Sequence, residues 1–465
     1  MSNRIITGRP LSRSEQSWCK AVSCGTGTTI LSLLVSKPPN LSHLHNALQK
    51  LQNSHPILSS KITYSTAAAA FSLIIPSTIP LPPFKLNSFS PPSPKDDVVS
   101  LSHLHIILEH EMNINPWSIP NLSSSSGVPV FFGSVYELPE EKWVVVFRLH
   151  TVVCDRTTAV GVLRELKELM KEIEEKNGGV EMGNSCFGKV SLGIEDLFPV
   201  GKGKKGIWAH GIDILGYSVN SLRFSNLKFK EVSGPRCSQM VRLQLSIQQT
   251  SQILMDCKLR GIKLHGALSA AGVMAAHSDQ RNSGDSLGYK RHIVSNKYAI
   301  VTLTDCRSQL EPPLSSHNFG SYHSAILSMH VVKRGETVWD LAERIYTSFT
   351  NSKLSNKHFT DMSDLNFLMC KAMENPSLTP HSSLRTSLMC VFEETVEDDL
   401  QSQFGLEDYM GCASTHGVGP SIAVFDTIRG GMLDIMFVYP SPLHSREQMG
   451  MMVEEMKRIL LEDRT

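Results

Sequence analysis

The strongest constraint on the fold is an apolar run that stops abruptly at a polar segment. Residues 143–149 are apolar apart from Arg148, as in a central strand buried on both faces. The segment 150–158, which has polar residues at both ends, breaks this run, and apolar residues then recur at helical spacing from Val160 to Ile173, with lysines and glutamates between them. The sequence therefore predicts a strand that delivers residues 150–155 to a turn in front of a long helix.

Similar alternation of strand and helix patterns extends over both halves of the chain. In the first half we expect strands at 28–35, 59–64, 69–75 and 128–135, helices at 41–55 and 106–113, and a proline- and serine-rich surface loop at 76–94. In the second half we expect strands at 241–245, 298–304, 422–427 and 433–438, and helices at 249–260, 266–277, 337–348, 361–373 and from residue 449 onward.

The two halves are separated by a stretch of different composition. Residues 177–229 contain glycine, lysine and isolated aromatic residues without a strong period, which is typical of a long crossover. We therefore predict a mixed α/β fold with an N-terminal lobe at 1–176, a linker at 177–240 and a C-terminal lobe at 241–465.

Composition excludes several classes of partner. The 45 lysines and arginines nearly balance the 44 aspartates and glutamates, so nucleic acid is not an expected partner. The 10 cysteines are scattered without zinc-type spacing, which predicts free thiols and no metal site. The N-terminus has no apolar core of a signal peptide and no window has the ~20 apolar residues of a membrane span, so we expect a cytoplasmic protein.

The segment between the predicted strand and helix reads Leu-His-Thr-Val-Val-Cys-Asp-Arg, residues 149–156. It resembles the HHxxxDG motif of CoA-dependent acyltransferases, which include peptide-synthetase condensation domains, plant BAHD acyltransferases and chloramphenicol acetyltransferase. When the motif is aligned on Asp155, His150 takes the first histidine position and Thr151 takes the second. Arg156 stands where the motif has glycine.

Other stretches resemble the same superfamily in the expected order, namely 9–12 with 48–56, 265–268, 305–307 and 318–320. The resemblance covers nearly the whole chain and is closest to plant condensation-like proteins of the alcohol-acetyltransferase type. It implies a two-lobed fold of the chloramphenicol-acetyltransferase type with a tunnel between the lobes. It also implies acyl-CoA as co-substrate, a small-molecule alcohol or amine as acceptor and no permanently bound cofactor. The sequence does not determine the oligomeric state, and we expect a monomer.

The resemblance also assigns supporting roles. The motif aspartate is structural in this superfamily and pairs with an arginine of the other lobe, so Asp155 and Arg307 are the expected pair. Cys154 is expected to pack inward, and Asn318 and Gly320 belong to a supporting segment of the second lobe.

Thr151 is the position where the expected chemistry fails. The second histidine accepts a proton from the acceptor, and a threonine hydroxyl has no pKa near neutrality for that task. His150 is one candidate, although adjacent side chains of a strand face opposite sides and a structural role for His150 fits as well. His323 is a second candidate that could reach the tunnel from the other lobe, and His265 is a third position to test.

These observations predict an acyltransferase in which Thr151 orients the acceptor and His150 or His323 handles the proton. The alternative is a catalytically degenerate relative that keeps the tunnel for binding a ligand or a partner, and a different reaction in the same pocket is a third possibility. Residues 201–206 match a Gly-x-Gly-x-x-Gly pattern but lack the strand and helix of a dinucleotide site, so we expect a solvated basic loop there.

Overall fold

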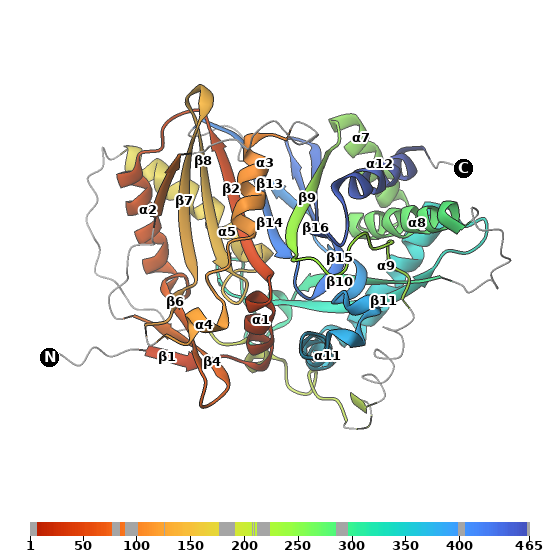
Figure 1. The fold of residues 1–465 in the computed structure, drawn as a ribbon, viewed down its shortest axis with the longest axis horizontal. Helices are drawn as coiled ribbons and strands as arrows, with labels where there is room; N and C mark the ends of the chain where they lie inside the picture. The colour runs from red at the N-terminus through yellow and green to blue at the C-terminus, as the bar shows by residue number, and fades with distance from the viewer. Residues whose placement is uncertain are drawn as a thin grey trace.

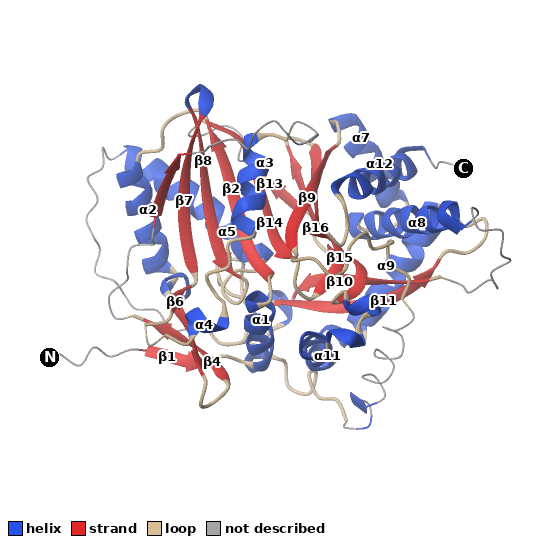
Figure 2. Cartoon of the chain, viewed as in Figure 1, coloured by secondary structure: helices blue, strands red, loops and turns tan. Residues whose placement is uncertain are grey.

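The protein consists of two sheet-based lobes that lie side by side (Figures 1 and 2). The computed structural model describes residues 7–76, 84–88, 101–124, 126–175, 191–206, 208, 210–211, 224–284, 296–398 and 405–462. This arrangement confirms the mixed α/β fold that the sequence predicts.

The large sheet of the N-terminal lobe has five strands in the order β14-β2-β8-β7-β5. Its strands are β14 (Leu406–Thr415), β2 (Thr26–Val35), β8 (Lys142–His150), β7 (Phe131–Leu138) and β5 (Phe84–Ser88). A second, smaller sheet contains β1 (Thr7–Pro10), β4 (Ala70–Ile75), β3 (Lys61–Ser65) and β6 (Val128–Pro129). The helices of this half are α1 (Arg13–Ser23), α2 (Leu41–Ser54), α3 (His103–Met112), α4 (Ile119–Leu122) and α5 (Arg156–Glu175).

The sheet of the C-terminal lobe has seven strands, six of them in the order β11-β10-β12-β15-β16-β9, with β13 paired to β15. Its strands are β9 (Cys237–Gln244), β10 (Lys297–Asp305), β11 (His323–Val331), β12 (Arg385–Phe392), β13 (Val396–Asp398), β15 (Gly419–Arg429) and β16 (Met432–Ser441). The helices are α7 (Ile247–Leu259), α8 (Leu264–Gly284), α9 (Val338–Leu354), α10 (Lys357–Thr360), α11 (Met362–Glu374) and α12 (Arg446–Glu462).

Strand β8 is the centre of the N-terminal sheet because it pairs with β2 on one side and β7 on the other. Its side chains alternate between two cores. Val145, Phe147 and Leu149 pack in the core that contains α2 and α5. Val144 and Val146 pack with α3 in a core that also takes residues from β9 and β16 of the other lobe (Figure 1). Burial on both faces explains why this strand is almost continuously apolar.

Two features of the N-terminal sheet were not predicted from the sequence. The stretch 76–94 was expected to be a loop, but its central part, Phe84–Ser88, forms β5 and pairs in parallel with β7. These five residues contain no proline, so their backbone N–H groups are free to join a sheet. The second feature is β14, which comes from the predicted C-terminal lobe but pairs antiparallel with β2 in the N-terminal sheet.

Most other expected elements are present near their predicted ranges, including the long helix α5 and the antiparallel pair β15 and β16. Much of the expected linker, 177–190 and 212–223, lies outside the described residues. Among the helices that the structure describes, none is long and apolar enough to cross a membrane.

Candidate active site

The motif segment lies where β8 ends and α5 begins, as the sequence predicts. Asp155 caps the new helix: its Oδ1 accepts the backbone N–H of Thr158 at 2.8 Å, and its carbonyl accepts that of Ala159 at 2.9 Å. Such a cap satisfies N–H groups that have no partner within the helix. The helix therefore holds the Asp155 side chain in one orientation.

His150 and Thr151 point to different surroundings. His150 is fully buried, its ring lies edge-on to Trp117 at a centroid distance of 5.1 Å, and its Nδ1 accepts the N–H of Val152 at 3.1 Å. Burial lowers the pKa of His150 to about 3. Thr151 instead lines a cavity between the lobes, which His150 does not. His150 is therefore placed as a neutral core residue, away from the cavity.

Asp155 forms the expected pair with Arg307 of the other lobe. Arg307 Nη2 donates to Oδ1 at 3.0 Å, and Nη1 lies 2.9 Å from Oδ2. Arg307 also pairs with Asp305 at 3.1 Å, at the end of β10. Burial alone would raise the pKa of Asp155, but the charge of Arg307 and the contact with His323 outweigh it and hold this pKa well below its usual range. The aspartate is ionised and joins the two lobes.

The segment 318–320 supports this pair through its backbone. The carbonyl of Asn318 accepts from Arg307 Nε at 3.1 Å, and the carbonyl of Gly320 accepts the N–H of Asp155 at 3.2 Å. Gly320 has φ of +154°, and a Cβ there would lie 2.7 Å from the ring of Tyr322. Glycine is thus favoured here, because a side chain would meet the Tyr322 ring and would have to adopt a rare φ. The Asn318 side chain faces outward and accepts from Ser315.

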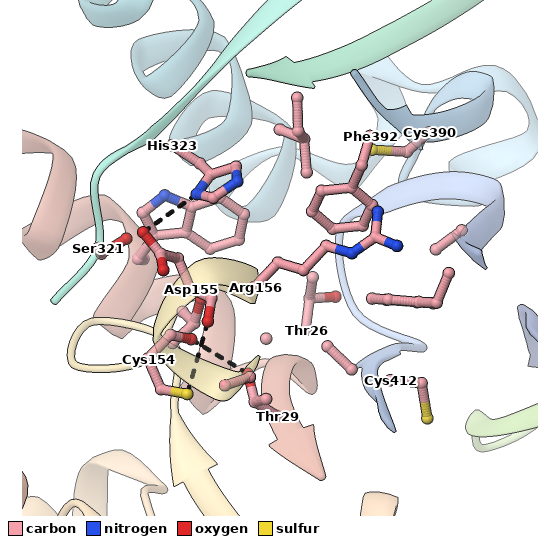
Figure 3. A pocket seen from close by; sticks show the side chains of 18 of the residues that line it. Thr26, Thr29, Cys154, Asp155, Arg156, Ser321, His323, Cys390, Phe392 and Cys412 are labelled. Carbon is pink, nitrogen blue, oxygen red and sulfur yellow. Dashed lines mark hydrogen bonds and ion pairs between the residues drawn. The ribbon is translucent and has the colours of Figure 1, made fainter. Parts of the chain in front are cut away.

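His323 is the first residue of β11 and reaches the same carboxylate from the other lobe. Its Nδ1 lies 3.0 Å from Asp155 Oδ2, within the distance of an ion pair (Figure 3). The same oxygen accepts the N–H of Tyr322 at 2.8 Å. The side chain of His323 is 12% exposed and borders the cavity. Of the two histidines predicted to handle a proton, only His323 lies both beside the carboxylate and beside the cavity.

Residues that the structure describes line two neighbouring cavities between the lobes. One, here called the apolar cavity, has a volume of about 240 Å³ and is lined by Thr151, Asp155, His323 and many apolar residues of both lobes. The other, here called the polar cavity, has a volume of about 460 Å³ and is lined by charged residues such as Glu165 and Glu394. His323 borders both cavities.

Cys154 and His265 do not offer reactive groups. Cys154 is 1% exposed, and burial raises the pKa of its thiol well above the usual range, so it is not a thiolate. His265 is 1% exposed, its Nδ1 lies 3.2 Å from the Glu393 carbonyl, and burial lowers its pKa to about 4. Both residues are parts of packed cores.

The expectation of a solvated basic loop at 201–206 is wrong for Lys205. The side chain of Lys205 is 10% exposed, and its ammonium pairs with Asp361 at 2.7 Å and Asp364 at 2.8 Å. This lysine therefore attaches the loop to α11 and the turn before it.

Sequence reasoning did not find the partners of Arg156. Its Nη1 donates to Asp426 Oδ1 at 3.1 Å, its Nη2 donates to the Asp426 carbonyl, and its guanidinium carbon lies 4.4 Å from the ring centre of Phe392. These partners are more than 200 residues away in sequence and carry no local motif. Only the pairing of the two lobes reveals them.

The two lobes and the Asp155 turn beside a cavity between them define the fold shared by chloramphenicol-acetyltransferase-like and condensation-domain proteins. No protein-family model and no curated protein sequence match this chain. Among solved structures, the trichothecene 15-O-acetyltransferase from Fusarium sporotrichioides matches with a TM-score of 0.69 at 12% identity, covering 98% of this chain and 95% of that one.

Two further structures match over similar lengths. Polyketide synthase associated protein 5 from Mycobacterium tuberculosis has a TM-score of 0.61 at 16% identity, with 97% of each chain covered. The first condensation domain of the calcium-dependent antibiotic synthetase has a TM-score of 0.62 at 11% identity, with 98% of this chain and 96% of that one covered. At these identities the matches establish the fold, and the chemistry has to be argued from the site.

Proposed function

We propose that the protein transfers an acyl group from acyl-CoA to a hydroxyl or amine of a small molecule, with His323 as the general base. The single observation that carries this proposal is the position of His323, whose Nδ1 lies 3.0 Å from Asp155 Oδ2 while its side chain borders the apolar cavity. The carboxylate favours the tautomer with the proton on Nδ1, which leaves Nε2 free to accept a proton.

The reaction then runs as a direct transfer. His323 Nε2 takes the proton of the acceptor hydroxyl or amine as its oxygen or nitrogen attacks the thioester carbonyl carbon. The tetrahedral intermediate collapses, the carbon–sulfur bond breaks, and the CoA sulfur leaves with the proton from His323. Thr151 borders the same cavity, and its hydroxyl would orient the acceptor by hydrogen bonding.

Asp155 has two functions in this proposal. It orients His323, and it stabilises the imidazolium that forms during attack. Arg307 and the N–H groups of Thr158 and Tyr322 fix the carboxylate in place. The motif aspartate would thus orient a histidine of the opposite lobe, which compensates for the threonine at position 151.

The test compares two histidine variants in assays with a panel of acyl-CoA donors and small alcohols and amines. We expect His323→Gln to lower kcat by roughly 10²–10⁴-fold, because a glutamine accepts no proton. His150→Gln is the matched control, since His150 is buried away from the cavity; the folded variant should keep the parental kcat. Equal losses in both variants would contradict the role of His323, and no turnover by the parent protein would contradict acyl transfer itself.

A further inference from the structure

The two cavities share a boundary that contains the proposed base. Six residues border both the apolar and the polar cavity, namely Arg156, Val160, Leu303, His323, Phe392 and Val396. A reactant that enters from the polar cavity therefore meets His323 and this group of side chains together. Among them, Arg156 has the longest side chain.

Arg156 is held rigidly across the boundary although arginine side chains are normally mobile. It starts from α5 in the N-terminal lobe, and its guanidinium donates to three acceptors of the other lobe: Asp426 Oδ1 at 3.1 Å, the Asp426 carbonyl and the Glu394 carbonyl at 3.1 Å. The guanidinium also lies over Phe392, and its side chain is 11% exposed (Figure 3). Its charge is compensated by Asp426, which is itself buried.

Charge indicates which reactant uses the polar cavity. Its lining includes four carboxylates, on Glu165, Asp305, Glu394 and Glu397, and two guanidinium groups, on Arg156 and Arg164. CoA carries several phosphate charges, so this lining disfavours it and favours a neutral or cationic acceptor.

We propose that Arg156 is a specificity-determining residue that limits the bulk of the acceptor reaching His323 from the polar cavity. The inference rests on the proposed acyl transfer. Arg156 and Phe392 form the part of the boundary that a large acceptor would have to displace, and moving Arg156 would break its hydrogen bonds to Asp426 and Glu394. Removing the side chain would widen the boundary between the two cavities while leaving His323 and Asp155 in place.

The first test measures acceptor selectivity. The measured quantity is kcat/KM for a branched or aryl-substituted alcohol divided by kcat/KM for a short primary alcohol. We expect Arg156→Ala to raise this ratio by about tenfold or more, since the bulky group gains the space of the missing side chain. Arg164→Ala is the matched control. Arg164 also extends from α5 and donates across the lobes to the Glu397 carbonyl at 2.9 Å, but it borders only the polar cavity. If the proteins turn over and Arg156→Ala leaves the ratio at the Arg164→Ala value, the inference is overturned.

A second test needs no turnover. Cys390 borders the apolar cavity but not the polar one. Burial raises the pKa of its thiol to about 12, so its alkylation is slow, and a difference in its rate between variants reports a change in access across the boundary. The rate with iodoacetamide and with a bulky maleimide is followed at this cysteine by peptide mass spectrometry in the parent protein, Arg156→Ala and Arg164→Ala. We expect Arg156→Ala alone to speed the reaction of the bulky reagent relative to the small one.

The two tests separate the inference from the proposed function. If no protein turns over any acyl-CoA but the bulky reagent reaches Cys390 faster in Arg156→Ala, acyl transfer is contradicted and the barrier formed by Arg156 is supported. If labelling is the same in all three proteins and there is no turnover, both ideas are overturned.

Discussion

Replacing Arg307 by methionine tests whether the ion pair between the lobes is as important as its geometry suggests. Methionine keeps an unbranched apolar side chain but removes the charge and every N–H donor. Asp155, which is 8% exposed, would lose the contacts of 3.0 and 2.9 Å to the guanidinium. It would keep the N–H groups of Thr158 and Tyr322 and the contact with His323.

The expected loss follows from what remains around the carboxylate. Removing one partner of a buried ion pair typically costs about 3–5 kcal/mol, because the other charge stays buried without compensation. Two backbone N–H groups still solvate Asp155, so we expect the lower end, about 3 kcal/mol. Asp305, the second partner of Arg307, has a side chain that is 25% exposed, so water compensates most of its loss.

The free energy of unfolding is measured by urea denaturation at pH 7, with tryptophan fluorescence and far-UV circular dichroism compared to detect separate unfolding of the two lobes. Arg260→Met is the matched control. Arg260 pairs with Glu343 at 3.1 Å, but the two side chains are 40% and 46% exposed, so this variant should lose about 1 kcal/mol or less. The reasoning is refuted if Arg307→Met is no less stable than Arg260→Met.

Two other predictions concern Thr151 and the buried histidines. If His323 is the base, Thr151→His should change kcat/KM of the parent protein by less than about tenfold, because the parent already has an imidazole at the cavity. The same substitution should restore activity to His323→Gln, because the new imidazole then borders the cavity. A gain of about 100-fold or more in the parent, measured in the same assays, would instead show that the parent lacks a working base. Burial lowers the pKa of both His150 and His444 to about 3, so folding excludes a proton that the unfolded chain binds near its ordinary pKa of about 6.5. The contribution of these histidines to the free energy of unfolding is fully present above the unfolded-state pKa of about 6.5 and falls as the pH drops towards 3. Between pH 7 and pH 5 the loss is about 2 kcal/mol per histidine. Urea denaturation at both pH values checks this, and His444→Gln should show a shallower loss than the parent; an unchanged slope would contradict the assignment.

The sequence alone determined the local structure of the motif. The apolar run before His150 and the helical period after Val160 predict the strand, the turn and the helix, because each pattern reports burial of an element against its neighbours. The alternation of side chains along the strand also predicted that His150 and Thr151 face different sides. The resemblance to HHxxxDG acyltransferases indicated the pairing of Asp155 with Arg307, which the structure contains.

Other parts of the fold depend on partners that no local pattern reveals. Strands β5 and β14 were missed, since a short strand next to prolines and a strand that crosses to the other lobe are stabilised by the sheet they join. Lys205 was expected to be solvated because its aspartate partners on α11 and the turn before it are far away in sequence.

The sequence alone shows that position 151 has no proton acceptor, because a threonine hydroxyl cannot replace an imidazole in that role. Which histidine lies beside the motif aspartate was decided only by the tertiary structure, which brings His323 from the start of β11 to Asp155 and the cavity. The same packing places Arg156 against Asp426 and Phe392. The physical reason is that a site between two lobes is assembled from residues distant in the chain, and their distances are set by how the sheets pack rather than by their spacing in sequence.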